Sequence, residues 1–131
     1  MANTPDPRSV QAPWNVLVVE DDDDMRAFFA DCVQRCEQLR LLDAVGTASA
    51  AKLAMRGGAG PLDVLLVDLG LPDGSGLDLI SLASRSHPEC ESLVVSMFGD
   101  EDNVLASIEA GALGYIHKDS TPDDIAHTIL E

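Results

Sequence analysis

Short apolar runs alternate along the chain with stretches in which apolar residues recur at three- and four-residue steps. Val16–Val19, Val64–Val67 and Leu93–Val95 are continuous apolar runs, and a polar residue follows each of them at once. Such runs are typical of strands that are buried on both faces of a parallel sheet. A weaker run at Leu41–Val45 and a short one that contains Tyr115 bring the predicted strands to five.

Helical spacing fills the stretches between these strands. Met25–Cys36 places its apolar residues on one helical face. The acids Asp22–Asp24 just before it favour a helix start, where carboxylates cap free N–H groups and suit the helix dipole. Further helices are predicted at Ala48–Met55 with Thr47 as its N-cap, from Leu77 to just before Pro88, at Asp102–Ala110, and after Ser120 with Pro122 in the first turn.

Strict alternation of five strands with helices predicts an α/β fold. The expected architecture is a five-stranded parallel sheet, doubly wound as (βα)5, with helices on both faces in a three-layer sandwich. A length of 131 residues fits one domain. Residues 1–14 combine six polar residues with three prolines, so we expect a flexible leader there and a single folded domain over residues 15–131.

The formal net charge of −15 at pH 7 restricts the classes of partner. Such an acidic surface repels phosphate backbones and anionic lipids, so this segment is not expected to bind nucleic acid or a membrane. The acidity either serves solubility or includes carboxylates that are clustered around a divalent cation. No apolar run is long enough to span a bilayer, and the three cysteines do not indicate a disulfide framework. A cytoplasmic protein is therefore expected.

The polar residues that follow the strands form the candidate site. In open α/β sheets, ligands bind beyond the carboxyl ends of the strands. Each side chain has an ordinary explanation when taken alone, as a helix cap, a loop residue or a surface charge. Their coincidence at four strand ends favours a single site: Glu20 and Asp21 after the first strand, Asp68 after the third, Ser96 after the fourth and Lys118 after the fifth.

The chemistry of these groups suits phosphoryl transfer. Clustered carboxylates repel one another, and a divalent cation such as Mg²⁺, which prefers oxygen ligands and keeps several waters, relieves the repulsion. An aspartate can attack phosphorus and form an acyl phosphate. The Lys118 ammonium and the Ser96 hydroxyl can then share the charge of the phosphoryl oxygens with the cation.

Four segments of the chain resemble the receiver domain of bacterial response regulators, over about residues 15–131. They are Leu17–Asp22, Leu66–Gly76, Val94–Ser96 and Gly111–Lys118, in the order and spacing of that family. The loop Leu69–Gly76 and the pair Lys118–Asp119 are most similar to the NarL/LuxR-type subfamily. The resemblance implies the flavodoxin-like, CheY-like form of the doubly wound fold.

The resemblance also implies a metal site. Asp68 matches the phosphorylated aspartate of the family and one of its metal ligands. Asp21 matches the acid that binds Mg²⁺ directly, and Glu20 matches the neighbour that often acts through water. Gly70 matches the position whose backbone carbonyl completes the site.

A switch and its partners follow from the same resemblance. Ser96 and Lys118 match the residues that contact the phosphoryl group, and Ser96 with Tyr115 matches the pair that changes position on activation. The implied phosphodonor is a sensor histidine kinase, and a homodimer stays an open alternative. The subfamily usually carries a C-terminal helix-turn-helix DNA-binding domain, which this chain lacks. The chain ends at Glu131, short for the family, so the expected output is transcription through a domain outside it.

Two departures from the family pattern matter. Glu20 stands where aspartate is commoner, which lengthens the side chain but keeps its charge, so metal binding is expected to survive. Asp119 stands where many relatives have proline, so a cis peptide after Lys118 is no longer implied.

Two other functions are compatible with parts of the pattern. A phosphohydrolase of the haloacid dehalogenase type uses the same acyl phosphate, but it needs a second acid two residues after the nucleophile, where this chain has Gly70. The other alternative is a stand-alone or phosphorylation-independent receiver-like protein-interaction module. A module without phosphorylation would normally have lost part of the acidic pocket or the lysine. The favoured expectation is therefore a signalling phosphoacceptor that catalyses only its own phosphotransfer and dephosphorylation. His117 is interpreted as a structural strand residue rather than a phosphate relay.

Overall fold

A computed structural model describes most of the chain: residues 13–56, 61–96, 105–106, 108–109, 111–117, 125 and 128–129. The predicted leader lies outside the described residues up to position 12, and so do Lys118, Asp119 and the side chain of Ser96. Within the described part, no helix is both long enough and apolar enough to cross a membrane.

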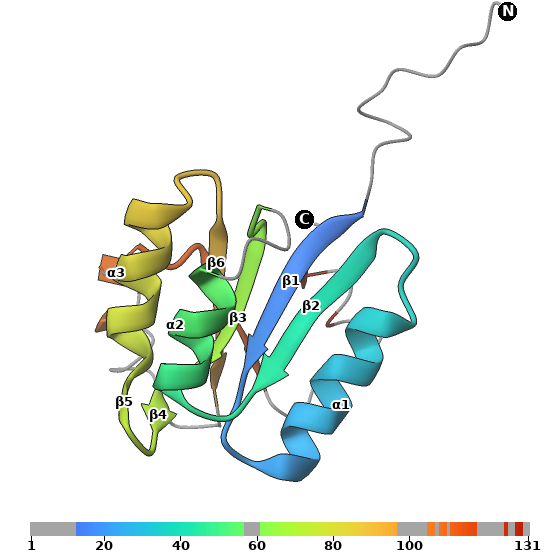
Figure 1. Ribbon diagram of the computed structural model, residues 1–131, viewed down its shortest axis with the longest axis horizontal. Helices are drawn as coiled ribbons and strands as arrows, with labels where there is room; N and C mark the ends of the chain where they lie inside the picture. Colours follow the sequence, from blue (N-terminus) through green and yellow to red (C-terminus); the bar gives the residue numbers. More distant parts are fainter. Residues whose placement is uncertain are drawn as a thin grey trace, which may run out of the picture.

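One five-stranded sheet forms the centre of the molecule, with the order β2-β1-β3-β6-β7 and parallel pairing throughout (Figure 1). After β1 the chain adds β2 on one side, and it then crosses to β3 on the other side. The direction of winding therefore changes between β1 and β3, and doubly wound folds bind their ligands at such a point. The strands are β1 Trp14–Val19, β2 Leu39–Val45, β3 Val64–Asp68, β6 Glu91–Ser96 and β7 Gly114–His117.

Helices cover both faces of this sheet, which confirms the predicted three layers. α2 (Ala48–Arg56) and α3 (Gly76–Ser86) pack on one face, and α1 (Asp23–Gln34) packs on the other (Figure 1). Ile125 and Ile129 are helical and buried on the same face as α1. The fold class expected from the sequence is therefore correct.

The two cores explain why the central strands are continuously apolar. Leu17 and Val19 of β1 point toward α2 and α3, whereas Val16 and Val18 pack with α1. Successive side chains of a strand point to opposite faces, so a strand between two helical layers needs apolar residues at every position. Phe29 of α1 is fully buried against the second face.

Several boundaries differ from the sequence prediction. β1 begins at Trp14 and β2 at Leu39, because backbone hydrogen bonds continue beyond the apolar runs. α1 ends at Gln34, so Cys36 lies past the helix even though it continues the apolar spacing. The segment after β3, described from the sequence only as a loop, contains a two-stranded hairpin, β4 (Gly70–Leu71) and β5 (Gly74–Ser75).

Asp73, in the turn of this hairpin, forms hydrogen bonds with the start of α2. Its carboxylate accepts hydrogen bonds from the backbone N–H of Ala48 at 2.6 Å, from the N–H of Ser49 at 3.0 Å and from the Ser49 hydroxyl at 2.8 Å. These bonds, led by the one from Ala48, hold the pKa of Asp73 below its usual range. The predicted cap Thr47 accepts from Ala50 N–H at 3.1 Å. One carboxylate from a distant loop therefore completes the N-terminus of this helix.

The lowered pKa of Asp73 predicts a pH-dependent contribution to stability. Because the folded-state pKa lies below the ordinary value of 3.8, the contribution is fully present above that value and is lost as the pH falls through the folded-state pKa. Asp73→Asn should lower the melting temperature at pH 7, and the difference from the parent should shrink toward pH 3. Melting curves followed by circular dichroism measure both. Asp31→Asn, an exposed acid of α1 paired with Arg35, is the matched control. A difference that does not change with pH would contradict this account.

Candidate functional site

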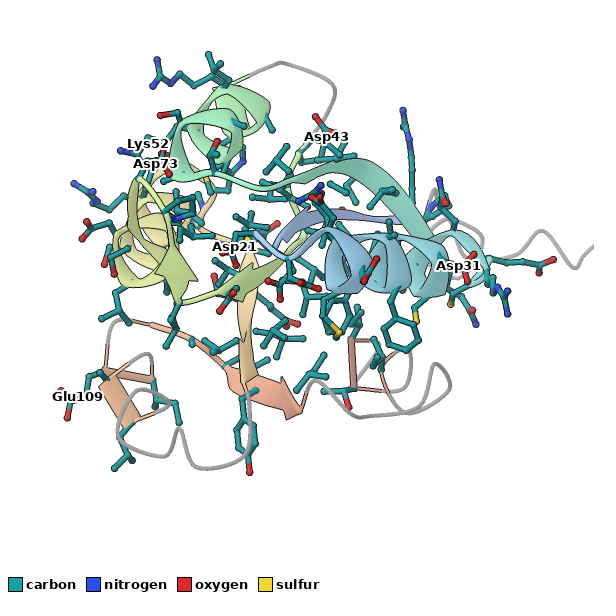
Figure 2. The ribbon with its side chains drawn as sticks, turned by 90° about the horizontal axis from the view of Figure 1, so that it is seen from below. Asp21, Asp31, Asp43, Lys52, Asp73 and Glu109 are labelled. Atoms are coloured by element: carbon teal, nitrogen blue, oxygen red, sulfur yellow. The ribbon has the colours of Figure 1, made fainter. Side chains whose placement is uncertain are left out.

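Three carboxylates meet at the carboxyl ends of β1 and β3. Glu20 and Asp21 follow β1, and Asp68 is the last residue of β3. The pairing of Val19 with Val67 places these ends side by side. One oxygen from each carboxylate lies within 4.8 Å of the other two. Figure 2, which views the molecule from below, shows Asp21 near the centre at this edge of the sheet.

The three carboxylates have different surroundings. Glu20 is completely buried, whereas Asp68 is half-buried and Asp21 is exposed. Glu20 donates its backbone N–H to the carbonyl of Val45 at 2.9 Å, and its Oε2 accepts from the N–H of Asp22 at 3.1 Å. The site therefore has one acid held inside the protein and two that a ligand can approach.

This donor set suits a small divalent cation. Two oxygens bound to the same Mg²⁺ lie at most about 4.2 Å apart, twice the usual Mg–O distance. The carboxylate oxygens of Glu20, Asp21 and Asp68, all within 4.8 Å of one another, meet that limit with small side-chain movements or with one water between an acid and the ion. Mg²⁺ bound here would offset most of the negative charge of the acids and polarise a phosphoryl oxygen.

The loop after Asp68 is held close to the site by its own hairpin. Gly70, at the start of the hairpin, donates its N–H to Asp68 Oδ1 at 3.3 Å. At the other end, Gly76 donates its N–H to the carbonyl of Leu69 at 3.2 Å. A Cβ on Gly76 would lie 2.6 Å from the Asp68 carbonyl oxygen and 2.8 Å from Leu69 Cα. Gly76 therefore lets the chain return against the backbone of Asp68, a role that the sequence analysis missed.

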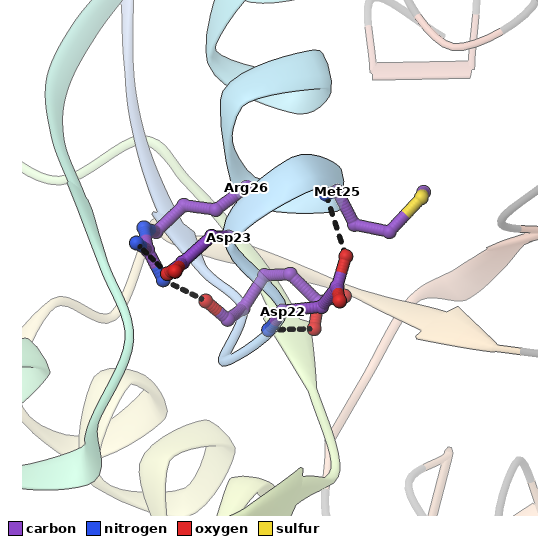
Figure 3. Close-up of polar contacts among 5 residues, drawn as sticks. Asp22, Asp23, Met25 and Arg26 are labelled. Carbon is purple, nitrogen blue, oxygen red and sulfur yellow. Dashed lines mark hydrogen bonds and ion pairs between the residues drawn. The ribbon is translucent and has the colours of Figure 1, made fainter.

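A second group of contacts shapes the loop between β1 and α1 (Figure 3). Asp22 is the N-cap of α1, because its Oδ2 accepts from Met25 N–H at 2.8 Å. Arg26 donates from Nη1 to the backbone carbonyl of Glu20 at 3.0 Å, and its Nη2 pairs with Asp23. The i,i+3 spacing of Asp23 and Arg26 could have indicated their pairing, but nothing in the sequence indicates the bond to Glu20.

The remaining predicted residues are placed only in part. Ser96 ends β6 and pairs with His117, and its neighbour Val95 pairs with Asp68. The backbone of Ser96 therefore lies at the same sheet edge as Asp68, while its side chain lies outside the described residues. Lys118 follows His117 and also lies outside them. Tyr115 lies in β7, with 49% of its surface exposed.

Comparison with known proteins identifies one family. Residues 16–130 match the family model described as the response regulator receiver domain. The nitrate/nitrite response regulator NarP of Escherichia coli K12 is 30% identical over 118 residues, covering 89% of this chain and 54% of that protein. The activator DevR/DosR of Mycobacterium tuberculosis H37Rv is 30% identical over 117 residues, covering 88% and 52%. The chain spans between 22% and 62% of the length of the first curated relatives.

Solved structures show the same fold. The signal receiver domain of NarL from Mycobacterium tuberculosis superposes with a TM-score of 0.79 at 23% identity, covering 90% of this chain and 94% of that one. A Burkholderia pseudomallei response regulator, solved with a phosphorylated aspartic acid, a calcium ion and citrate, has a TM-score of 0.73 at 25% identity, with coverages of 88% and 66%.

The close approach of Gly76 predicts a cost for any side chain at that position. Gly76→Ala places a methyl group against backbone atoms of Asp68 and Leu69, so it should destabilise the protein by about 1–3 kcal/mol, as overpacking does. Gly70→Ala is the matched control, because its Cβ would meet nothing within 4 Å and its reduced unfolded-state entropy is neutral or slightly favourable. Urea unfolding of the two variants measures the difference, and equal midpoints would show that the contact is unimportant.

Proposed function

This chain belongs to the receiver domain family of two-component response regulators and is of the NarL/LuxR-like type, and we propose that it accepts a phosphoryl group on Asp68 in the presence of Mg²⁺. The observation that carries the proposal is the meeting of Glu20, Asp21 and Asp68 within 4.8 Å at the winding change of the sheet. Acids that lie together at this edge provide both a nucleophile and a cation site.

Asp68 is the best placed of the three acids to act as the nucleophile. Glu20 is buried, and its Oε2 accepts a bond from the N–H of Asp22, so an incoming phosphoryl group cannot reach it as readily. Asp68 ends β3, which lies between β1 and β6. The acids of β1 therefore flank it on one side and Ser96 on the other, an arrangement that suits metal binding and phosphoryl contact respectively.

The proposed reaction is a phosphoryl exchange between two side chains. An oxygen of the Asp68 carboxylate attacks the phosphorus of a phosphohistidine, and the P–N bond breaks with its electron pair passing to the histidine nitrogen. The product is an acyl phosphate on Asp68. Glu20, Asp21 and Asp68 would hold the cation, with the carbonyl of Gly70 as a further ligand, and Ser96 and Lys118 would bind phosphoryl oxygens. Tyr115 and Ser96 then respond as the switch.

The relatives support this proposal and suggest the output. The Burkholderia pseudomallei structure carries a phosphorylated aspartate and a divalent cation, and the names of NarP and DevR/DosR describe a response regulator and a transcriptional activator. The donor is accordingly proposed to be a sensor histidine kinase, and this chain is proposed to act in the cytoplasm. The output is proposed to be transcription through a helix-turn-helix domain beyond this chain, with a homodimer as one form of the active state.

A receiver-like module that is never phosphorylated is the second candidate, because the exposed Tyr115 in β7 offers a surface for a partner protein. The two candidate functions differ in Mg²⁺ binding, because a pure interaction module has no need of a cation at Asp68.

Phosphorylation at Asp68 predicts a response to a phosphoryl mimic. Beryllofluoride with Mg²⁺ should shift the amide NMR signals of the parent around β3 and β6, and acetyl phosphate should add one phosphoryl group. Asp68→Asn should do neither, because the amide cannot form the acyl phosphate. Asp43→Asn, an equal change of charge on β2, which β1 separates from β3, is the control and should respond like the parent. A parent protein that binds no Mg²⁺ at millimolar concentration would favour the interaction module.

A further inference from the structure

Arg26 joins the first turn of α1 to the end of β1. Its Nη1 donates to the backbone carbonyl of Glu20 at 3.0 Å, six residues earlier in the chain, and its Nη2 pairs with Asp23 (Figure 3). Only 26% of the Arg26 side chain is exposed, compared with 87% of the Asp23 side chain. The Arg26 side chain is therefore packed into the loop, and its bond to the Glu20 carbonyl is partly shielded from solvent.

Gly46 makes room for this guanidinium. Gly46 follows β2, and a Cβ at that position would lie 2.8 Å from Nη1 of Arg26. The obstacle would be the flexible end of a side chain rather than backbone, and Gly46 does not have a positive φ. An alanine at position 46 therefore fits the backbone but pushes the guanidinium away from the Glu20 carbonyl.

The bond from Arg26 completes a series of three that hold the acidic segment. Glu20 N–H donates to the Val45 carbonyl, and Asp22 N–H donates to Glu20 Oε2. Between these two peptide units lies the one that joins Glu20 to Asp21, and Arg26 binds its carbonyl. Because a peptide unit is planar, a bond that orients this carbonyl also orients the N–Cα bond of Asp21.

We infer that Arg26 is a positioning residue for the metal site, setting the direction in which Asp21 presents its carboxylate toward Asp68. The inference rests on the proposed function, because it concerns the same Mg²⁺ site. Arg26 acts through the backbone and does not touch the ion. Such supporting contacts commonly contribute about 10-fold or more to metal affinity.

The positive charge of Arg26 and its bond to the Glu20 carbonyl predict opposite effects on Mg²⁺ affinity. A measurement of that affinity therefore distinguishes between them. A cation beside three carboxylates repels Mg²⁺, so an arginine that acted only through its charge would weaken binding, and its removal would tighten it. An arginine that acts by orienting the Glu20 carbonyl strengthens binding, and its removal weakens it. The pairing with Asp23 offsets part of the positive charge, which reduces the first effect and leaves the second intact.

The test compares Mg²⁺ affinity by calorimetry in the parent, Arg26→Gln and Gly46→Ala. Both variants should weaken Mg²⁺ binding by about 10-fold, although Gly46→Ala keeps the positive charge. Combining them should add little, because both remove the same contact. Arg35→Gln, which breaks an exposed i,i+4 pair with Asp31 on the same helix, is the matched control and should bind like the parent.

A second readout needs no metal. In the apo protein, the amide of Asp22 should exchange faster with solvent in Arg26→Gln and Gly46→Ala than in the parent, since the segment is less firmly held. Unchanged or tighter Mg²⁺ binding in Arg26→Gln, or unchanged binding in Gly46→Ala, would overturn the inference while the parent still binds. Failure of the parent to bind Mg²⁺ would instead overturn the proposed function, so the two failures are distinguishable.

Discussion

The parallel pairing of β1 with β3 is the constraint on which the site depends. It places the residues after Val19 beside Asp68, and it brings together three acids that electrostatics alone would keep apart. Two ionised carboxylates at the observed separation of up to 4.8 Å repel by about 3 kcal/mol at an effective dielectric constant of about 20. The buried apolar faces of both strands oppose this repulsion, because a shift of register would turn their side chains to the wrong layers. The core therefore holds the acids in a geometry that a cation relieves.

The sequence was most informative where one physical rule acts on a continuous segment. β1, β3 and β6 were recognisable because strands between two helical layers need apolar residues at every position, and the polar residues after them marked the edge of the sheet. Element ends were less accurate, since hydrogen bonding extends β1 back to Trp14 and β2 back to Leu39 without an apolar signal. The hairpin after β3 could not be inferred from Gly70–Ser75, because strands of two residues depend on where the rest of the chain holds them.

The contacts missed by the sequence analysis are those between distant backbone and side-chain atoms. From the sequence, Gly76 is one more glycine of a turn, and only the fold shows that a Cβ there would lie 2.6 Å from the Asp68 carbonyl oxygen. Arg26 looks like the partner of Asp23, and only the fold shows that it also binds the carbonyl of Glu20. Ser96 is located only in part: the β3–β6 register places its backbone at the same edge of the sheet as Asp68. The contacts of its hydroxyl and those of Lys118 stay predictions.

These contacts restrain both of the loops that carry the acids. The loop after Asp68 is tied at its turn by Asp73 to α2 and at its end by Gly76 to the Asp68 backbone. The loop after β1 is held by hydrogen bonds at three successive peptide units, and Arg26 donates one of these bonds. The proposed phosphorylation of Asp68 would add charge at a point that is restrained on these sides, so we expect the response of the domain toward β6 and β7. That side carries Ser96 and the half-exposed Tyr115, the two residues to which the family resemblance gives the switch.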